Sequence, residues 1–288
     1  MATDHYPALD DPSITETKNA LHAYARILGN WLKHCRAKRK HWWHASLRPS
    51  LNGLTTGVVH AEIDFELELN LRESLLQCRT STGKYLSEKL QGQSASSLAD
   101  SIEHFLVANG IGKQSIPDKT DSPENTTEYS GYSQDHALIM AEVFNSVSAT
   151  MNTFRAGIRE ETSPVQLWPH HFDLSLLWLP GDKIADQDPA NEEYADKQMN
   201  FGFVLGDEGI AEPYFYITAY PLPEALPRLQ LPKGTVWQTE GFNGAVLLYK
   251  TLIENSSNPD DYLMELWHSL LKTGRENMME NATEGTLP

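Results

Sequence analysis

The sequence predicts an α+β protein whose antiparallel sheets form two associated halves, each covered by helices. Amphipathic helical periodicity opens each half, a period of two follows it, and the connections between the predicted strands are too short for parallel crossovers. We expect the first half over residues 1–112 and the second over 133–288. The segment 113–132 is polar and rich in Pro, Ser and Thr, which predicts a linker.

In the first half, a helix is predicted from Thr15 to Arg36, because apolar residues recur at three- and four-residue spacing. Ser13 and Glu16 have the spacing of a capping box at its start. The clearest strand alternates apolar and acidic residues from Ile63 to Leu69. Further strands are predicted at 42–51, 54–60, 74–80 and after Gly83, and a second helix at 97–109.

In the second half, Ser133 is expected to cap a long helix, and Pro259 to open the last helix at its first position. Strands are predicted between them at 171–179, 201–205, 213–220 and 244–250. Helix, strands and helix thus occur twice, which raises the alternative of a pseudo-duplication. In that alignment His44-x-Ser46-Leu47 is matched to His171-x-Asp173-Leu174.

Composition limits the classes of function. The 288 residues are 40% hydrophobic, 9% aromatic and 22% charged, which is typical of a water-soluble globular protein. A net charge of −16 opposes binding to nucleic acid or to anionic lipid. Two cysteines, Cys35 and Cys78, are too few for a disulfide framework, and no apolar run is long enough for a membrane span. We therefore expect a cytoplasmic protein that binds neither nucleic acid nor membrane.

The candidate site depends on residues that share a strand face. In strands at 42–51 and 171–179, His44 would project with Arg48, and His171 with Asp173. If the halves bring these rows together, His44 is the candidate proton carrier or ligand contact and Asp173 its acidic or orienting partner. The residues expected to line the cleft around them are His41, Trp42, Trp43, Arg48, Thr55 and His171.

Two chemistries fit this set. A zinc-type ion would take His44, His171 and Asp173, with His41 or His170 as a further ligand. In a metal-free pocket, the tryptophans would form the wall and His44 with Arg48 would meet a polar or anionic group. For each histidine alone, a hydrogen-bonded structural role is the third interpretation. The sequence assigns no cofactor.

Other catalytic signatures are missing. The sequence has no G-x-S-x-G elbow, no G-x-G-x-x-G turn and no phosphate-binding P-loop. The acidic stretch from Asp182 to Glu212 lacks calcium-loop spacing and is interpreted as a solvated loop. The basic run at 33–40 is interpreted as a solvated helix end, with an anion site as the alternative. Arg48 would strengthen that anion site.

Several blocks resemble an uncharacterised bacterial family known only as a domain of unknown function. The blocks are His41-Trp42-Trp43-His44-x-x-Leu47 with Gly53-Leu54-Thr55-Thr56, Ser163-Pro164-Val165 with Phe172-Asp173-Leu174, and Ala219-Tyr220-Pro221 with Pro223. The family pattern places a histidine after Ser-Pro-Val, where this chain has Gln166, and a Tyr-Ser-His-Glu block where it has Tyr194-Ala195-Asp196-Lys197. If the family's histidines are catalytic, the resemblance implies an altered or inactive member.

We therefore expect an uncharacterised protein that binds or transforms a small polar or anionic molecule in a cleft lined by His, Trp and Asp. The alternative is a non-catalytic interaction module whose exposed tryptophans engage a protein surface. The sequence leaves the reaction class, and whether the chain is an enzyme, open.

Overall fold

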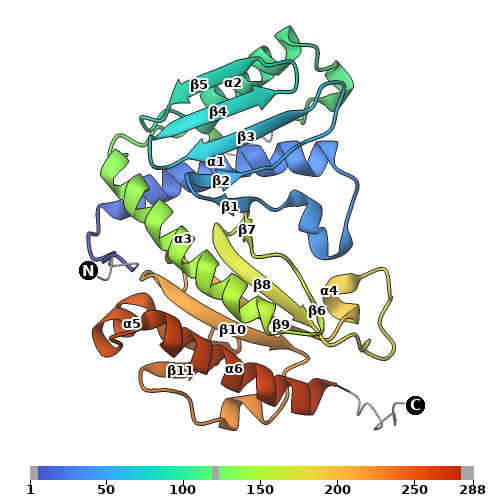
Figure 1. The fold of residues 1–288 in the computed structure, drawn as a ribbon, viewed down its shortest axis with the longest axis vertical. Coiled ribbons are helices and arrows are strands. Elements are labelled where there is room, and N and C mark those ends of the chain that lie inside the picture. The colour runs from blue at the N-terminus through green and yellow to red at the C-terminus, as the bar shows by residue number, and fades with distance from the viewer. Residues whose placement is uncertain (1–5, 119–122, 280–288) are drawn as a thin grey trace. The chain divides into compact units, whose positions relative to one another are not determined.

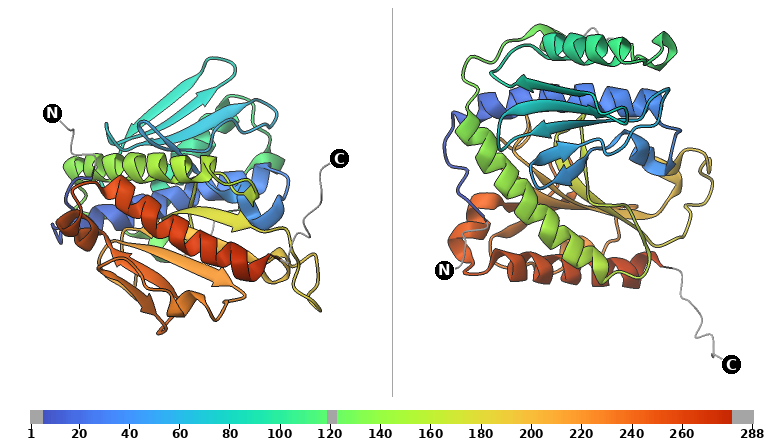
Figure 2. Two further views of the ribbon diagram at one scale, coloured as in Figure 1. Left: turned by 60° about the horizontal axis from the view of Figure 1, so that its bottom comes forward. Right: turned by 45° about the horizontal axis from the view of Figure 1, so that its top comes forward.

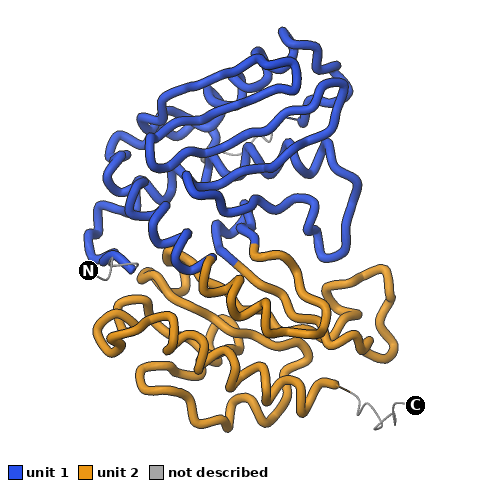
Figure 3. The backbone as a smooth tube through the Cα atoms, in the orientation of Figure 1, with its two compact units in different colours: residues 1–148, 166–174 blue, residues 149–165, 175–288 orange. Residues whose placement is uncertain are grey.

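The structure is a computed structural model that describes residues 6–118 and 123–279. It confirms the predicted α+β class with two antiparallel sheets (Figure 1). The chain forms two compact units, residues 1–148 with 166–174, and 149–165 with 175–288 (Figure 3). The linker expected at 113–132 stays a prediction, and its residues 119–122 lie outside the described part.

The boundary between these two compact units falls inside the long helix α3 (Gln134–Ala156). Phe144, on the first part of α3, packs edge-on against Phe172 of the first unit, with ring centroids 5.6 Å apart. Phe154, near the end of α3, packs against Phe201 of the second unit at 5.0 Å. One amphipathic helix thus supplies core residues to both units.

The first unit contains a five-stranded meander in the order β1-β2-β3-β4-β5, with helices α1 (Ile14–Cys35) and α2 (Ala95–Ala108) (Figure 2). Every second residue of β3 faces the core, where Trp31 of α1 packs edge-on against Phe65 at 5.5 Å. The strands of this sheet are β1 (Arg48–Ser50), β2 (Gly53–Thr55), β3 (Phe65–Asn70), β4 (Leu75–Thr80) and β5 (Tyr85–Lys89). The remaining short elements of this unit are η1 (Lys40–Ala45), η2 (Lys113–Ser115), η3 (Pro123–Thr126) and β7 (Gln166–Trp168).

The strand predicted at 42–51 is wrong over its first part. Residues Lys40–Ala45 form the 3-10 segment η1, and β1 begins only at Arg48. The cause is the backbone of His41 and Trp42, which both adopt positive φ and turn the chain. The strand predicted at 54–60 is likewise shorter, since β2 ends at Thr55.

The predicted capping box at the start of α1 is also wrong. Ser13 has a helical backbone conformation and makes no side-chain cap, and its hydroxyl instead donates to Asp11 at 2.6 Å. The Glu16 carboxylate accepts the backbone N–H of Gly131 at 2.6 Å. The cap predicted for α3 is confirmed, because the Ser133 hydroxyl accepts the N–H of His136 at 3.4 Å.

The second sheet has the strand order β11-β12-β10-β9-β8-β6, and β7 pairs with β8 off this path. Its strands are β6 (Glu161–Thr162), β8 (Asp173–Leu179), β9 (Gln198–Val204), β10 (Tyr214–Tyr220), β11 (Thr235–Gln238) and β12 (Gly244–Leu248). The accompanying helices are α4 (Glu192–Ala195), η4 (Leu226–Arg228), α5 (Tyr249–Asn255) and α6 (Pro259–Met278). The first sheet runs in sequence order whereas β12 lies between β10 and β11 in the second, so the two sheets do not share one topology.

Candidate functional site

A backbone turn directly after α1 places the predicted His-Trp-Trp-His block. His41 has φ 46° and ψ 33°, and Trp42 has φ 59° and ψ 18°. Two consecutive non-glycine residues in the left-handed region store strain, and such strain is concentrated at functional sites. The turn brings Trp42 back against the last turn of α1.

Trp42 lies among cationic side chains. The Lys33 Nζ lies 5.7 Å and the Lys38 Nζ 5.1 Å from the centroid of its indole ring. Its ring stacks on the imidazole of His44, with centroids 5.5 Å apart and planes inclined by 25°. Trp42 nevertheless remains 42% exposed. We call this group the basic corner and define it as Lys33, Arg36, Lys38, Arg39, Trp42 and His44.

The positive charge of the basic corner is only partly engaged. The Arg36 guanidinium donates to the carbonyls of Thr56 at 2.7 Å and Val58 at 2.9 Å, so it anchors the corner to the chain after β2. Within residues 6–118 and 123–279, neither Lys33, Lys38 nor Arg39 forms an ion pair with a carboxylate. In a chain with net charge −16, these cations form a local positive surface.

His44 is a buried, neutral member of the corner. Its Nδ1 accepts the backbone N–H of Arg39 at 3.2 Å, which places the ring proton on Nε2. Burial lowers the pKa of His44, and the charges of Lys38, Arg36, Lys33 and Arg39 lower it further. In this tautomer the Nε2–H group of His44 is a hydrogen-bond donor. The ring of His44 also holds the indole of Trp42 in place by stacking on it. Its contacts in the described part of the chain include no carboxylate, so Asp173 is not its direct partner there.

His41 and Trp43 lie on the other side of the turn. Their rings stack with centroids 6.1 Å apart, and His41 is buried. The Trp43 carbonyl accepts the Ser46 hydroxyl at 2.9 Å. The Trp43 Nε1 is buried and makes no hydrogen bond to any described residue. Trp43 therefore supports the turn, and Trp42 is the tryptophan that the corner presents to solvent.

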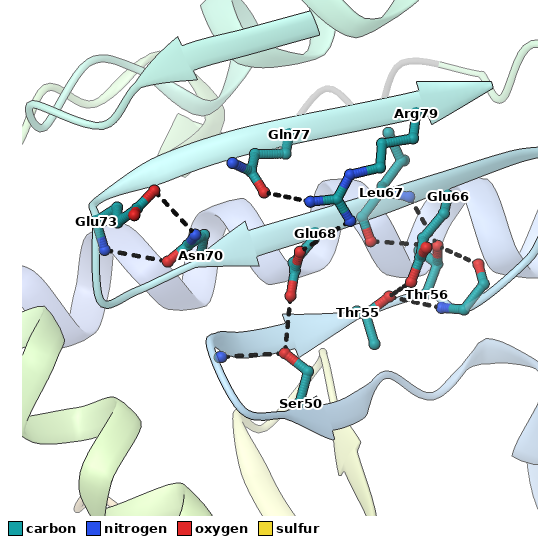
Figure 4. Close-up of polar contacts among 12 residues, drawn as sticks. Ser50, Thr55, Thr56, Glu66, Leu67, Glu68, Asn70, Glu73, Gln77 and Arg79 are labelled. Atoms are coloured by element: carbon teal, nitrogen blue, oxygen red, sulfur yellow. Dashed lines mark hydrogen bonds and ion pairs between the residues drawn. The ribbon is translucent and has the colours of Figure 1, made fainter. Parts of the chain in front are cut away.

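Arg48 and Thr55 belong to a polar row that crosses the opposite face of the first sheet from the core. The register places Arg48 opposite Thr55, Thr55 opposite Glu68, and Glu68 opposite Gln77. Figure 4 shows the row around Glu68, whose carboxylate accepts the Ser50 hydroxyl at 2.9 Å. The Arg79 guanidinium lies 3.5 Å from the same carboxylate. Thr55 donates to Glu66 at 2.6 Å, so this predicted site residue is engaged within the sheet.

Gln166 extends this row on the far side of β1. Leu47 and Leu167 exchange two backbone hydrogen bonds of 3.0 Å in an antiparallel bridge, which places Gln166 opposite Arg48. The Gln166 Oε1 accepts from the Ser46 hydroxyl at 2.7 Å and from Arg48 Nη1 at 3.2 Å. Arg48 Nη1 also donates to Ser46 Oγ at 2.8 Å.

The remaining predicted residues, His171 and Asp173, lie in the turn before β8 and at its first position. The neighbouring His170 carbonyl lies 3.2 Å from His22 Nε2, on α1. His22 and Lys33, which contacts Trp42, are eleven residues apart on that helix, or roughly 16 Å at 1.5 Å per residue. Asp173 is buried. The shared role predicted for His44 and Asp173 therefore stays a prediction.

No group of three or more His, Cys, Asp or Glu side chains in the described part of the chain could hold a metal ion. The zinc alternative therefore finds no ligand cluster there. A cavity of about 180 Å³ in the first unit lies among α1, α2 and the chain around η3, with Trp31 and Glu103 among its walls. None of the predicted site residues lines it. No helix among the described residues combines the length and apolarity that a membrane crossing requires.

Residues 6–281 match the profile described as "Family of unknown function (DUF5996)". The chain belongs to this family. The match covers nearly the whole chain and confirms the resemblance to a domain-of-unknown-function family. The comparison with curated proteins and the comparison with solved structures found no match.

The sequence predicts an anion site at the end of α1 only as the alternative to a solvated helix end, and it does not predict that the basic run contacts Trp42. The signal was present as five cations within residues 33–40, next to an aromatic pair. The predicted extended strand would place Trp42 and His44 on the same face, because residues two apart in a strand point the same way, but it does not predict that either ring meets the basic run. The left-handed turn instead brings both rings together with the lysines.

Proposed function

We propose that the protein binds a small anionic molecule at the basic corner. The observation that carries the proposal is the cluster of Lys33, Lys38 and Trp42, in which two cations without carboxylate partners in the described structure flank an exposed indole. A small anion between the two lysines would gain charge-assisted hydrogen bonds from both ammonium groups. The indole edge would add apolar contact to a ligand that is larger than a simple ion.

The strained turn supports this proposal. A left-handed conformation at both His41 and Trp42 costs stability that a plain chain reversal with glycine would avoid. This turn fixes the position of the Trp42 side chain, which stacks on the buried imidazole of His44. A rigid aromatic group lowers the entropy lost when a ligand binds.

The exposed Trp42 also fits an interaction module that engages an acidic protein segment, which is the alternative from the sequence. Trp is enriched among residues that dominate protein interfaces. A small anion needs only the two lysines, whereas a protein segment needs a larger complementary surface. The two ligand classes can therefore be separated with probes of different size.

The test compares sulfate and chloride at equal ionic strength, with the melting temperature and tryptophan fluorescence as readouts. The test variant is Lys33→Gln with Lys38→Gln, and the charge-matched control is Lys84→Gln with Lys89→Gln, two exposed lysines at β5. We expect sulfate to raise the melting temperature of the native protein and of the control above the value in chloride. In the test variant this difference between sulfate and chloride should disappear. Equal responses in all three proteins would contradict the proposal. Binding of a poly-glutamate peptide without any sulfate effect would assign the corner to protein interaction.

A further inference from the structure

The side-chain amide of Gln166 is fully buried yet only half satisfied. Gln166 has 0% exposure, and its Nε2 has no hydrogen-bond partner in the described structure. Its Oε1, by contrast, accepts from both Ser46 and Arg48. A buried donor without an acceptor costs about 1–3 kcal/mol, so native proteins rarely keep one.

The orientation of this amide follows from its neighbours. Exchanging its oxygen and nitrogen would place Nε2 against the guanidinium of Arg48, which can only donate. The oxygen therefore faces Arg48, and the two N–H groups of Nε2 face away from it. The hydroxyl of Ser46 holds the same arrangement by receiving a hydrogen bond from Arg48 at 2.8 Å.

We propose that Gln166 Nε2, beside Arg48 and Ser46, is a binding point for a carboxylate oxygen of a small molecule. Two N–H donors require an acceptor, and the adjacent guanidinium charge favours an anionic one. Gln166 and Ser46 are fully buried and only Arg48 is partly exposed, so a small group reaches Nε2 only when these side chains move aside.

This proposal does not rest on the basic corner. Its residues lie on β1, β7 and the preceding Ser46, and the Lys33 and Lys38 side chains contribute nothing to it. A failure of the sulfate experiment would leave it intact.

The probe is acetate, with chloride at equal ionic strength as the reference. The readout is the side-chain amide resonance pair of Gln166 in ¹⁵N spectra, assigned by its disappearance in Gln166→Glu. We expect acetate to shift these resonances and to raise the melting temperature of the native protein. Gln166→Glu keeps an oxygen for Ser46 and Arg48 but replaces the two donors with an acceptor. This variant should bind acetate about tenfold more weakly, which is the loss of one hydrogen bond to a charged group.

Gln77→Met is the matched control, because Gln77 is also buried, belongs to the same polar row, and its Oε1 accepts from Arg79 at 3.1 Å. Acetate binding should survive in that variant. Unshifted Gln166 resonances throughout the acetate titration would overturn the proposal, and so would equal loss of binding in Gln77→Met. If Gln166→Glu fails to fold, the resonances of the native protein, assigned through the backbone, decide the question.

Discussion

The imidazole of His44 stacks on the indole of Trp42 while its Nδ1 accepts the backbone N–H of Arg39 at 3.2 Å. One buried ring thus orients the exposed aromatic side chain and closes the turn that follows α1. Because Lys33 and Lys38 lie beside the same indole, the protonation of His44 is coupled to any charge that enters the basic corner.

The first prediction concerns this coupling. Burial and then the neighbouring cations lower the pKa of His44, so an anion held by Lys33 and Lys38 offsets part of the cationic contribution and raises that pKa. By linkage, sulfate should bind more tightly as the pH falls through the pKa of His44. Imidazole ¹⁵N titrations with and without sulfate measure the shift. The shift should vanish in Lys33→Gln with Lys38→Gln, and an unchanged pKa in the native protein would contradict the coupling.

The second prediction concerns His170. Its imidazole is partly exposed but lies against Trp168 and His171, and burial followed by the charge of His171 lowers its pKa from 6.5 to about 4. The unfolded state therefore binds more protons than the native state between these values. The free energy of unfolding should therefore fall as the pH drops from 6.5 to about 4. Below pH 4 the titration of His170 should no longer change it.

Urea unfolding across this range checks the second prediction. His170→Gln should flatten the profile because no imidazole at that position has to be charged on unfolding. His171→Gln should narrow the pH range over which the free energy of unfolding falls, since it removes a charge that lowers the pKa of His170. A profile that neither substitution changes would contradict the assignment.

The third prediction concerns Gly29 in the middle of α1. A Cβ at this position would lie 2.7 Å from Pro169 Cγ and 2.8 Å from its Cβ, in a ring that cannot rotate away. Gly29→Ala should therefore lower the free energy of unfolding by about 1–3 kcal/mol, although alanine is the better helix former. Chemical denaturation measures the loss. Gly157→Ala is the control, because its nearest neighbour would lie 3.5 Å away.

The fourth prediction concerns the ion pair between Glu160 and Arg275. The guanidinium donates to both carboxylate oxygens, at 2.8 and 2.7 Å, and this hydrogen bonding is the main cause that lowers the pKa of Glu160. Glu160→Gln should cost about 1–2 kcal/mol at neutral pH. The stabilisation is complete above the ordinary value of 4.5 and is lost as the pH falls through the lowered pKa.

The exposed pair of Glu224 and Arg228 provides the comparison for this ion pair. Its side chains are 87% and 77% exposed, so Glu224→Gln should change stability little at any pH. Equal costs for the two substitutions, measured by urea unfolding at several pH values, would contradict the argument.

The residue pattern by itself determined the α+β class and most of its elements. Alternation from Phe65 to Asn70 and helical spacing from Ile14 to Cys35 are local properties, so a pattern in the chain is enough to predict them. The block around Trp42 was also recognisable as a candidate site. Its local structure was not, because positive φ at His41 and Trp42 opposes the ordinary preference of both residues.

The tertiary structure alone decided which polar groups meet. Gln166 lies opposite Arg48 only because Leu47 and Leu167 pair across more than a hundred residues, and no local pattern encodes such a register. The division of α3 between two units likewise follows from the cores that Phe144 and Phe154 join. Periodicity tells which face of an element is buried, and only the packed chain tells which other residues bury it.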